Sequence, residues 1–239
     1  MEIGIIQTGR VGAALAATHG DYPSMIAAML PGGDFRFRSH AVVDGAPLPP
    51  PASADGWLIT GSRHGVYDDL PWIAPLKTWL RTVRGAGRPI LGICFGHQIL
   101  AEAFGGRAIR HSGGWRLGVH DFLVTPQPGW LTEATPVRLH SVHQDQVVAI
   151  PDDATVWATS PGCALAGLAY GDPARPDAVS IQPHPEFSAS YVGALARTLT
   201  DDGRVPRAVG EGAIAEIGAV TVDNLRVARW LARYLRGRP

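Results

Sequence analysis

The sequence predicts an α/β fold: an open, doubly wound and mostly parallel sheet flanked by helices, with a small antiparallel flap. Short apolar segments that suit buried parallel strands alternate with longer segments of helical periodicity. The clearest run of this kind is a strand over 57–60, a helix over 72–83 and a strand over 89–93. Right-handed parallel crossovers follow from this order, so we expect both strands to end at one crevice.

The segments before residue 57 fit the same pattern. Residues 3–7 predict a first buried strand, 25–30 a helix and 35–43 a second strand. Gly9 and Gly12 after the first strand form only a weak match to a dinucleotide-binding loop, because glutamine stands where the first glycine of that motif belongs. We therefore expect no nucleotide at this loop and no cofactor elsewhere.

The second half of the chain predicts the flap and the last helices. Short alternating segments over 115–124, 137–139, 155–159 and 164–170 should extend the sheet and form the flap. After Pro185 the periodicity becomes helical, and the final helix carries arginines on the face opposite its apolar residues, as a solvated face does. We expect a single domain over 1–239, with C-terminal helices over 188–239.

Composition limits the partners and the compartment. Lys plus Arg and Asp plus Glu number 21 each, a formal net charge of +0, so no basic field favours nucleic acid. Cys94 and Cys163 make no disulfide framework, and Cys163 is expected in the core. The chain begins with a strand-like segment instead of a leader, and no apolar run approaches the ~20 residues of a membrane helix. A soluble, cytoplasmic protein is expected.

Residues 89–106 form the stretch around which the chain is organised. A buried strand is followed by Gly92-Ile93-Cys94-Phe95-Gly96 and then by a helical pattern, the layout of a nucleophile elbow with a thiol in place of serine. Glycines on both sides of Cys94 suit a crowded turn or a positive φ. At a helix N-terminus the dipole would favour the thiolate. The alternative is a buried structural cysteine.

Residues 178–186 supply the partners that a catalytic cysteine needs. A short apolar strand leads to His184 and, two residues later, Glu186, while Pro183 and Pro185 force an extended backbone around the histidine. A general base needs a carboxylate on its second ring nitrogen to hold one tautomer. We predict that His184 takes the proton of Cys94 and that Glu186 orients His184.

Together these motifs resemble the class I (triad-type) glutamine amidotransferase family, which implies a flavodoxin-like fold. The resemblance covers about 55–190. The matching segments are Gly92-x-Cys94-x-Gly96-x-Gln98, Gln182-x-His184-Pro185-Glu186, Thr60-Gly61-Ser62, Gly114-Trp115-x-x-Gly118 and Ser141-Val142-His143-Gln144-Asp145. In two places the sequence departs from the family pattern: Ser62 replaces a glycine of the oxyanion loop, and Arg63 replaces the proline that usually follows.

The resemblance implies the roles of individual residues. Cys94 would attack the side-chain amide of glutamine, giving a γ-glutamyl thioester and ammonia. The backbone N–H of Phe95 and one from Gly61 or Ser62 would hold the oxyanion. Gln98 and the backbone near Val142 and His143 would bind the substrate.

Three functions remain open at this point. The sequence has no Gly-x-x-x-x-Gly-Lys and no domain that could activate an acceptor, so an amidotransferase would need a separate synthetase subunit. A stand-alone hydrolase or transpeptidase of γ-glutamyl amides or peptides would use the same triad. Segments 6–9 and 19–22 resemble that branch of the family. The third possibility is a catalytically silent interaction protein on the cysteine-elbow fold, against which the intact His184–Glu186 pair argues.

A metal site is the remaining alternative for these histidines. His140, His143 and His184 could be imagined as ligands, but histidines among strands are commonly satisfied by ordinary hydrogen bonds. We therefore expect no metal.

Overall fold

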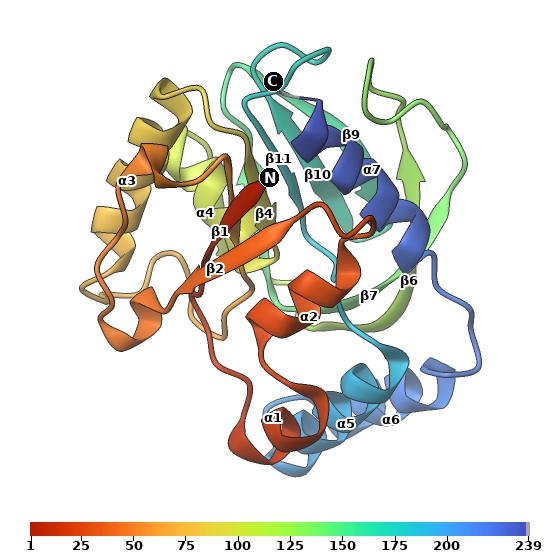
Figure 1. Cartoon of the computed structure of the whole chain (residues 1–239). Coiled ribbons are helices and arrows are strands. Elements are labelled where there is room, and N and C mark those ends of the chain that lie inside the picture. The colour runs from red at the N-terminus through yellow and green to blue at the C-terminus, as the bar shows by residue number, and fades with distance from the viewer. Residues whose placement is uncertain (238–239) are drawn as a thin grey trace.

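A computed structural model describes residues 1–237, which fold around one large mixed sheet (Figure 1). The strands of this part of the chain are β1 (Glu2–Ile6), β2 (Arg36–His40), β3 (Gly56–Ile59), β4 (Ile90–Ile93), β5 (Arg107–Arg110), β6 (Arg116–Val124), β7 (Val137–His143), β8 (Asp145–Ala149), β9 (Ala154–Ser160), β10 (Cys163–Tyr170) and β11 (Ala178–Ile181). The helices are α1 (Ala13–His19), α2 (Tyr22–Met29), α3 (Ile73–Gly85), α4 (Phe95–Ala103), α5 (Ala189–Asp201), α6 (Arg207–Glu216) and α7 (Asn224–Arg236).

The large sheet has a parallel half and an antiparallel half. Within residues 1–237 its nine strands lie in the order β2-β1-β3-β4-β11-β10-β9-β6-β7. Neighbours from β2 to β11 pair in parallel, and neighbours from β11 to β7 pair antiparallel. The predicted mostly parallel sheet, extended by antiparallel strands, is thus confirmed. β5 and β8 form a separate two-stranded sheet.

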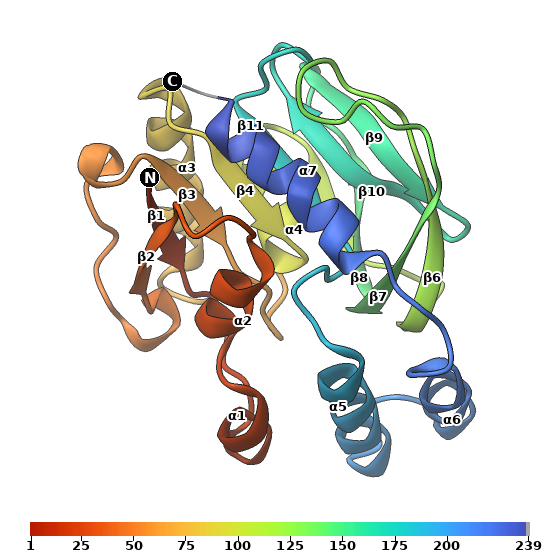
Figure 2. The ribbon, with the colours of Figure 1, turned by 45° about the vertical axis from the view of Figure 1, so that its right-hand side comes forward.

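Alternation along the parallel strands fills a core on each face of the sheet. On β1, Ile3 and Ile5 face the side covered by α2 and α7, whereas Ile6 faces the side covered by α3 and α4. Figure 2 shows α7 across one face of the sheet and α3 and α4 behind the other. Because both faces are covered, the central strands are apolar throughout, as in other buried parallel sheets.

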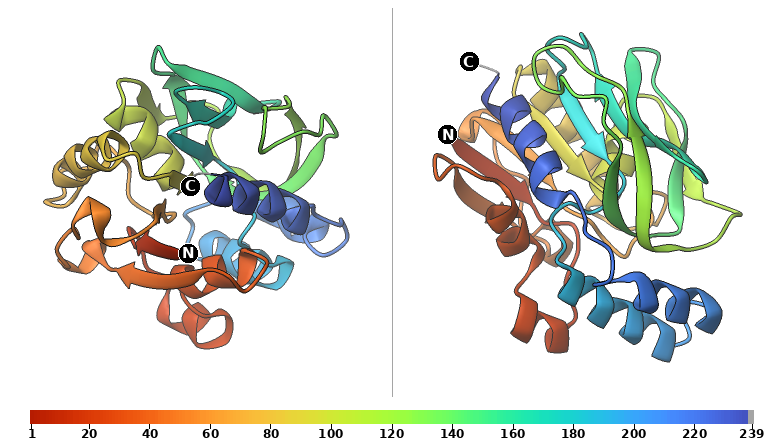
Figure 3. Two further views of the ribbon diagram at one scale, coloured as in Figure 1. Left: turned by 45° about the horizontal axis from the view of Figure 1, so that its top comes forward. Right: turned by 90° about the vertical axis from the view of Figure 1, so that its right-hand side faces the viewer.

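Three helices lie beyond the carboxyl ends of the parallel strands. Figure 2 and the right-hand view of Figure 3 show α1, α5 and α6 below the sheet, on the side toward which the β4 arrow of Figure 2 points. α5 packs on both α1 and α6. This arrangement places a helical wall beside the edge where open α/β sheets hold their sites.

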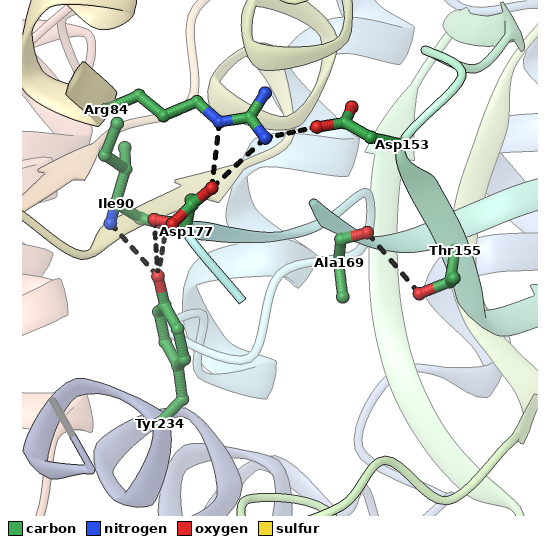
Figure 4. A network of polar contacts seen from close by, with 7 residues as sticks. All are labelled: Arg84, Ile90, Asp153, Thr155, Ala169, Asp177 and Tyr234. Carbon is green, nitrogen blue, oxygen red and sulfur yellow. Dashed lines mark hydrogen bonds and ion pairs between the residues drawn. The ribbon is translucent and has the colours of Figure 1, made fainter. Parts of the chain in front are cut away.

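A polar network ties the opposite end of the sheet (Figure 4). The Arg84 guanidinium donates to Asp177 at 3.2 Å and also pairs with Asp153. The Tyr234 hydroxyl, from α7, shares its one hydrogen between the carbonyl oxygens of Ile90 and Asp177 and accepts from the Ile90 N–H. These contacts join α3, α7 and the starts of β4 and β11, away from the carboxyl ends.

The structure corrects several expected boundaries. The strand expected over 35–43 ends at His40, because β1 ends at Ile6 and the chain then turns into a 3-10 helix over Val42–Asp44. β7 continues to His143 through its full pairing with β6, beyond the expected 137–139. Helix α6 lies within the predicted C-terminal helical region, whereas α1 and the β5–β8 sheet were not expected from the sequence. Among the described residues, no helix combines the length and apolar character needed to cross a membrane.

Candidate active site

Cys94 lies at a strained turn between β4 and α4. Its φ of 55° and ψ of −103° make it the one non-glycine residue with positive φ among residues 1–237. Its N–H still donates to the Ile181 carbonyl at 2.9 Å, so the pairing of β4 with β11 continues as far as the turn. Such strain persists only where the surroundings enforce it, and it is common at functional sites. The predicted elbow geometry is present.

The two elbow glycines are required by close packing of the backbone. A Cβ on Gly92 would lie 2.5 Å from the carbonyl oxygen of Gly96, and one on Gly96 would lie 2.4 Å from that of Ile59. Neither glycine has a positive φ. From the sequence, either a crowded turn or a positive φ could explain these two glycines. The crowded turn is the reason, whereas the positive φ belongs to Cys94.

His184 and Glu186 follow β11 and form a buried pair next to Cys94. His184 Nδ1 lies 2.7 Å from Glu186 Oε1, and their side chains are 4% and 1% exposed. The His184 N–H donates to the His140 carbonyl at 2.8 Å, which anchors this turn to β7. The Cys94 side chain lies beside the ring, close enough that it too raises the pKa of His184. Because Nδ1 is taken by Glu186, Nε2 is the nitrogen that faces Cys94.

The electrostatic surroundings of His184 favour its protonated form. Burial by itself would lower the pKa of His184. The carboxylate of Glu186, and after it Cys94, outweigh burial and raise that pKa to about 10. The imidazole can therefore hold a proton between Glu186 and the sulfur at neutral pH, as an orienting carboxylate allows a catalytic base to do.

An aromatic cluster supports the imidazole from its face. The ring of Phe187 stacks on that of His184 with 4.0 Å between centroids and 5° between planes. Tyr22 of α2 stacks on Phe187, and Tyr191 of α5 meets it edge to face. Burial in this cluster raises the pKa of Tyr22 to about 12.

The loop after β3 lies where the resemblance places an oxyanion loop. A Cβ on Gly61 would lie 3.2 Å from His184 Cε1 and 3.7 Å from Cys94 Cβ, so this loop approaches both side chains. The Ser62 hydroxyl donates to the Thr8 carbonyl at 2.7 Å and accepts from the His64 N–H at 3.2 Å. The serine that departs from the family pattern therefore braces the loop. Opposite it, the Phe95 N–H lies in the first turn of α4, where no intrahelical partner exists.

The junction between β7 and β8 is close to α4 as well. Gln98 Nε2 donates both to the Asp145 carbonyl at 3.0 Å and to Gln182 Oε1 at 3.1 Å. His143 Nδ1 donates to the same Asp145 carbonyl at 3.1 Å, and burial lowers the pKa of His143 to about 3. The predicted substrate-binding side chains are thus largely engaged within the protein. Gln98 retains Oε1 as an acceptor for a substrate, and near His143 the backbone groups remain available for substrate binding.

A cavity of about 810 Å³ joins these parts. Of the nine residues predicted for the site, the structure brings seven to its wall: Gly61, Ser62, Cys94, Gln98, Val142, His143 and His184. Glu186 lies behind His184, and Phe95 lies behind the elbow with a fully buried side chain.

Within the described part of the chain, no group of three or more His, Cys, Asp or Glu side chains is placed to hold a metal ion. Cys163 is buried in the core, as expected, and burial raises its pKa to about 11.

Sequence reasoning missed the aromatic residues of the site. Phe187 directly follows Glu186, so its position in the chain was a usable signal. Tyr22 and Tyr191 belong to helices distant in sequence, and no local pattern marks them. The loop of Gly9 and Gly12, considered for a nucleotide, packs instead on the oxyanion loop: a Cβ on Gly9 would lie 2.8 Å from the Gly61 carbonyl oxygen.

Comparison with known families agrees with this geometry. The model of the family described as glutamine amidotransferase class-I matches residues 52–195, which is more than half of the chain and includes the elbow and the His184–Glu186 pair. The chain belongs to the class-I glutamine amidotransferase family. The resemblance and fold predicted from the sequence are thereby confirmed.

Curated relatives of this amidotransferase domain carry different names. Gamma-glutamyl peptidase 4 of Arabidopsis thaliana is 25% identical over 93% of this chain and 90% of its own length. Gamma-glutamyl peptidase 5 of the same plant is 31% identical over 56% of this chain, and this chain spans only 54% of it. A glutamine-hydrolyzing GMP synthase of Burkholderia vietnamiensis is 31% identical over 57% of this chain but 25% of the synthase.

Solved structures show the same fold for the whole amidotransferase chain. The crystal structure of a glutamine amidotransferase from Thermotoga maritima superposes with a TM-score of 0.73 at 22% identity, covering 100% of this chain and 97% of the other. A glutamine amidotransferase from Methylobacillus flagellatus also gives 0.73, at 20% identity, with 100% and 92% covered.

Proposed function

We propose that this protein hydrolyses the γ-glutamyl C–N bond of glutamine or of a γ-glutamyl amide through a thioester on Cys94. The observation that carries the proposal is the strained Cys94 at the β4–α4 turn, with the hydrogen-bonded His184–Glu186 pair buried beside it. A thiol, a base and an orienting carboxylate in this arrangement form a nucleophilic triad.

In the acylation step the Cys94 thiolate attacks the γ-carbonyl carbon, with the thiol proton held on His184. The carbonyl oxygen becomes an oxyanion that the Phe95 N–H and an N–H of Gly61 or Ser62 stabilise. A donor of this kind is worth on the order of 10²–10³ in rate. The C–N bond then breaks as His184 Nε2 passes its proton to the leaving nitrogen, which departs as ammonia or an amine.

In the deacylation step water attacks the thioester carbon while His184 accepts its proton. The C–S bond breaks, the thiolate of Cys94 is restored, and the product leaves with a free γ-carboxylate. Glu186 stays ionised throughout and keeps His184 Nδ1 as the donor toward Oε1. An amine in place of water would give a transpeptidase by the same step.

Gln98 supports the orientation of the glutamyl part. Both hydrogens of its amide nitrogen are used by Asp145 and Gln182, so the side chain can offer only Oε1, a hydrogen-bond acceptor. An acceptor of this kind suits the α-ammonium group of a γ-glutamyl substrate. We propose this contact as the role of Gln98.

A stand-alone γ-glutamyl hydrolase is favoured over a synthetase-dependent subunit by two observations. The cavity of about 810 Å³ is large for glutamine alone, because drug-sized ligands occupy sites of roughly 300–1,000 Å³. In addition, the curated relative gamma-glutamyl peptidase 4 is matched over 90% of its length, whereas the GMP synthase is matched over 25% of its length. We further propose one domain over 1–239 and, with both cysteines free, a reducing cytoplasmic setting.

The deciding experiment measures release of glutamate and of ammonia or amine by the purified chain. The substrates are glutamine and γ-glutamyl dipeptides, and Cys94→Ala is the control. Turnover of dipeptides that Cys94→Ala abolishes supports the stand-alone hydrolase. Turnover of glutamine alone, at a low rate, favours a subunit that needs a synthetase.

A labelling experiment completes the test. Azaserine, an electrophilic glutamine analogue, is expected to modify Cys94 and not Cys163, which mass spectrometry of the digested protein would locate. Absence of both turnover and Cys94 labelling would contradict the proposed function and would favour the catalytically silent alternative.

A further inference from the structure

The cavity around Cys94 has two walls of different chemistry. What these walls imply about the substrate rests on the proposed function. One wall is polar and comes from the loop after β3, from β5 and from the β7–β8 turn. Tyr67 of that loop donates to Asp145 Oδ2 at 2.8 Å, and Arg110 lies near Asp145. With Gln98 Oε1, this wall offers groups of both charge signs, which suit the α-ammonium and α-carboxylate groups of a γ-glutamyl unit.

The other wall carries apolar side chains from α1, β7 and α5, with Thr198, Asp202 and Arg204 at the far end of α5. It includes Leu15, Val142 and Leu195, which are only partly buried and therefore have apolar surface left for a ligand. Val142 and Leu195 each pack against two hydrophobic clusters, one that contains Phe187 and one that contains Leu199. The apolar wall thus begins at the ring stacked on His184 and continues along α5.

The chemistry of the reaction decides which part of the substrate meets the apolar wall. His184 Nδ1 is bound to Glu186, so Nε2 must deliver the proton to the leaving nitrogen. The leaving group therefore departs next to His184, where Phe187 and the apolar wall lie. The γ-glutamyl unit then extends from Cys94 toward the polar wall.

We infer that the natural substrates are γ-glutamyl amides whose amine portion carries a large apolar or aromatic group, such as γ-glutamyl dipeptides with an apolar second residue. The wall formed by Leu15, Val142 and Leu195 is the binding site for that group. An apolar side chain buried there leaves water and adds binding energy that ammonia or glycine as leaving group cannot supply.

The test compares kcat/KM for γ-Glu-Phe and γ-Glu-Leu with kcat/KM for γ-Glu-Gly and glutamine. We expect the apolar dipeptides to be favoured by about tenfold or more, the scale on which an apolar pocket discriminates. Leu195→Ser and, as a second variant, Leu15→Ser should reduce the ratio of γ-Glu-Phe to γ-Glu-Gly to less than about threefold. Leu123→Ser is the matched control, since Leu123 is 61% exposed on β6 and outside the cavity, and it should leave the ratio unchanged.

Equal kcat/KM for γ-Glu-Phe and γ-Glu-Gly would overturn the inference, as would a preference that both variants retain. If azaserine labels Cys94 but no dipeptide is hydrolysed, the test is how well each dipeptide protects Cys94 against labelling. The inference requires γ-Glu-Phe to protect Cys94 at a lower concentration than γ-Glu-Gly does. Equal or weaker protection by γ-Glu-Phe overturns the inference. Failure of the proposed function has a different signature, namely the loss of labelling together with all turnover.

Discussion

His184 and Phe187 lie ring on ring, with 4.0 Å between centroids and planes 5° apart. Glu186 holds the same imidazole from its edge through a 2.7 Å contact to Nδ1. The candidate base is therefore fixed both in rotation and in plane, with Nε2 directed at Cys94. An aromatic face also stabilises a cation above it, so the stacked ring favours the imidazolium form that the proposed acylation step needs.

Replacement of Phe187 by leucine should weaken catalysis while retaining apolar bulk. We expect kcat to fall about twofold to fivefold, because an aromatic face contributes roughly 0.5–1 kcal/mol to a nearby cation. The alkaline limb of the pH profile of kcat/KM should move to lower pH. Phe187→Tyr keeps the ring and should restore both values. A leucine variant with an unchanged pH profile would show that the ring only fills space.

Glu186→Gln should lower kcat by on the order of 10²-fold or more, because an amide no longer holds the base in one tautomer or stabilises its charge. The direction of the pH effect follows from the causes of the shift. Glu186 raises the pKa of His184, so its removal lowers that pKa, and activity that needs protonated His184 is lost at lower pH. The measurement is kcat/KM against pH for both proteins. An alkaline limb that stays in place would mean that another group produces it.

Ser62→Ala should reduce kcat/KM several-fold with little loss of stability. The hydroxyl joins the Thr8 carbonyl to the His64 N–H and so holds the oxyanion loop next to Cys94; one such hydrogen bond contributes about 1 kcal/mol. Ser53→Ala, which removes a distant hydrogen bond to the Pro50 carbonyl, is the matched control. Equal activities of the two variants would argue that the loop is held without the Ser62 hydroxyl.

Gly96→Ala should destabilise the fold by roughly 1–3 kcal/mol, because the added methyl would lie 2.4 Å from the Ile59 carbonyl oxygen in a buried position. Urea unfolding followed by tryptophan fluorescence measures the change. The control is Gly212→Ala in α6, where a Cβ has open space and alanine favours the helix. If both substitutions stabilise the protein, the elbow is less tightly packed than the structure indicates.

Much of the fold and the centre of the site were predictable because their signals are local. A buried strand such as β4 is readable from its own apolar residues, and the elbow is readable from the glycines beside Cys94. His184 and Glu186 stand two residues apart, so their pairing needs only one turn of backbone. Local patterns of this kind can be interpreted without knowing which distant segments are in contact.

The remaining features of the site depend on which distant segments meet. The sequence could propose Gln98 as a substrate ligand, but only its contacts with Asp145 and Gln182 decide that Oε1 is the atom left to bind. The stack of Tyr22 on Phe187 likewise joins α2 to the turn after β11.

The sequence by itself determined the strands of the large sheet, the elbow and the identity of the three candidate catalytic residues, because each is encoded within a few neighbouring positions. Only the tertiary structure decided the positive φ of Cys94, the bracing role of Ser62 and the two walls of the cavity. These depend on close approach between elements far apart in the chain, where packing and hydrogen bonding select one side-chain orientation from several that the local sequence allows.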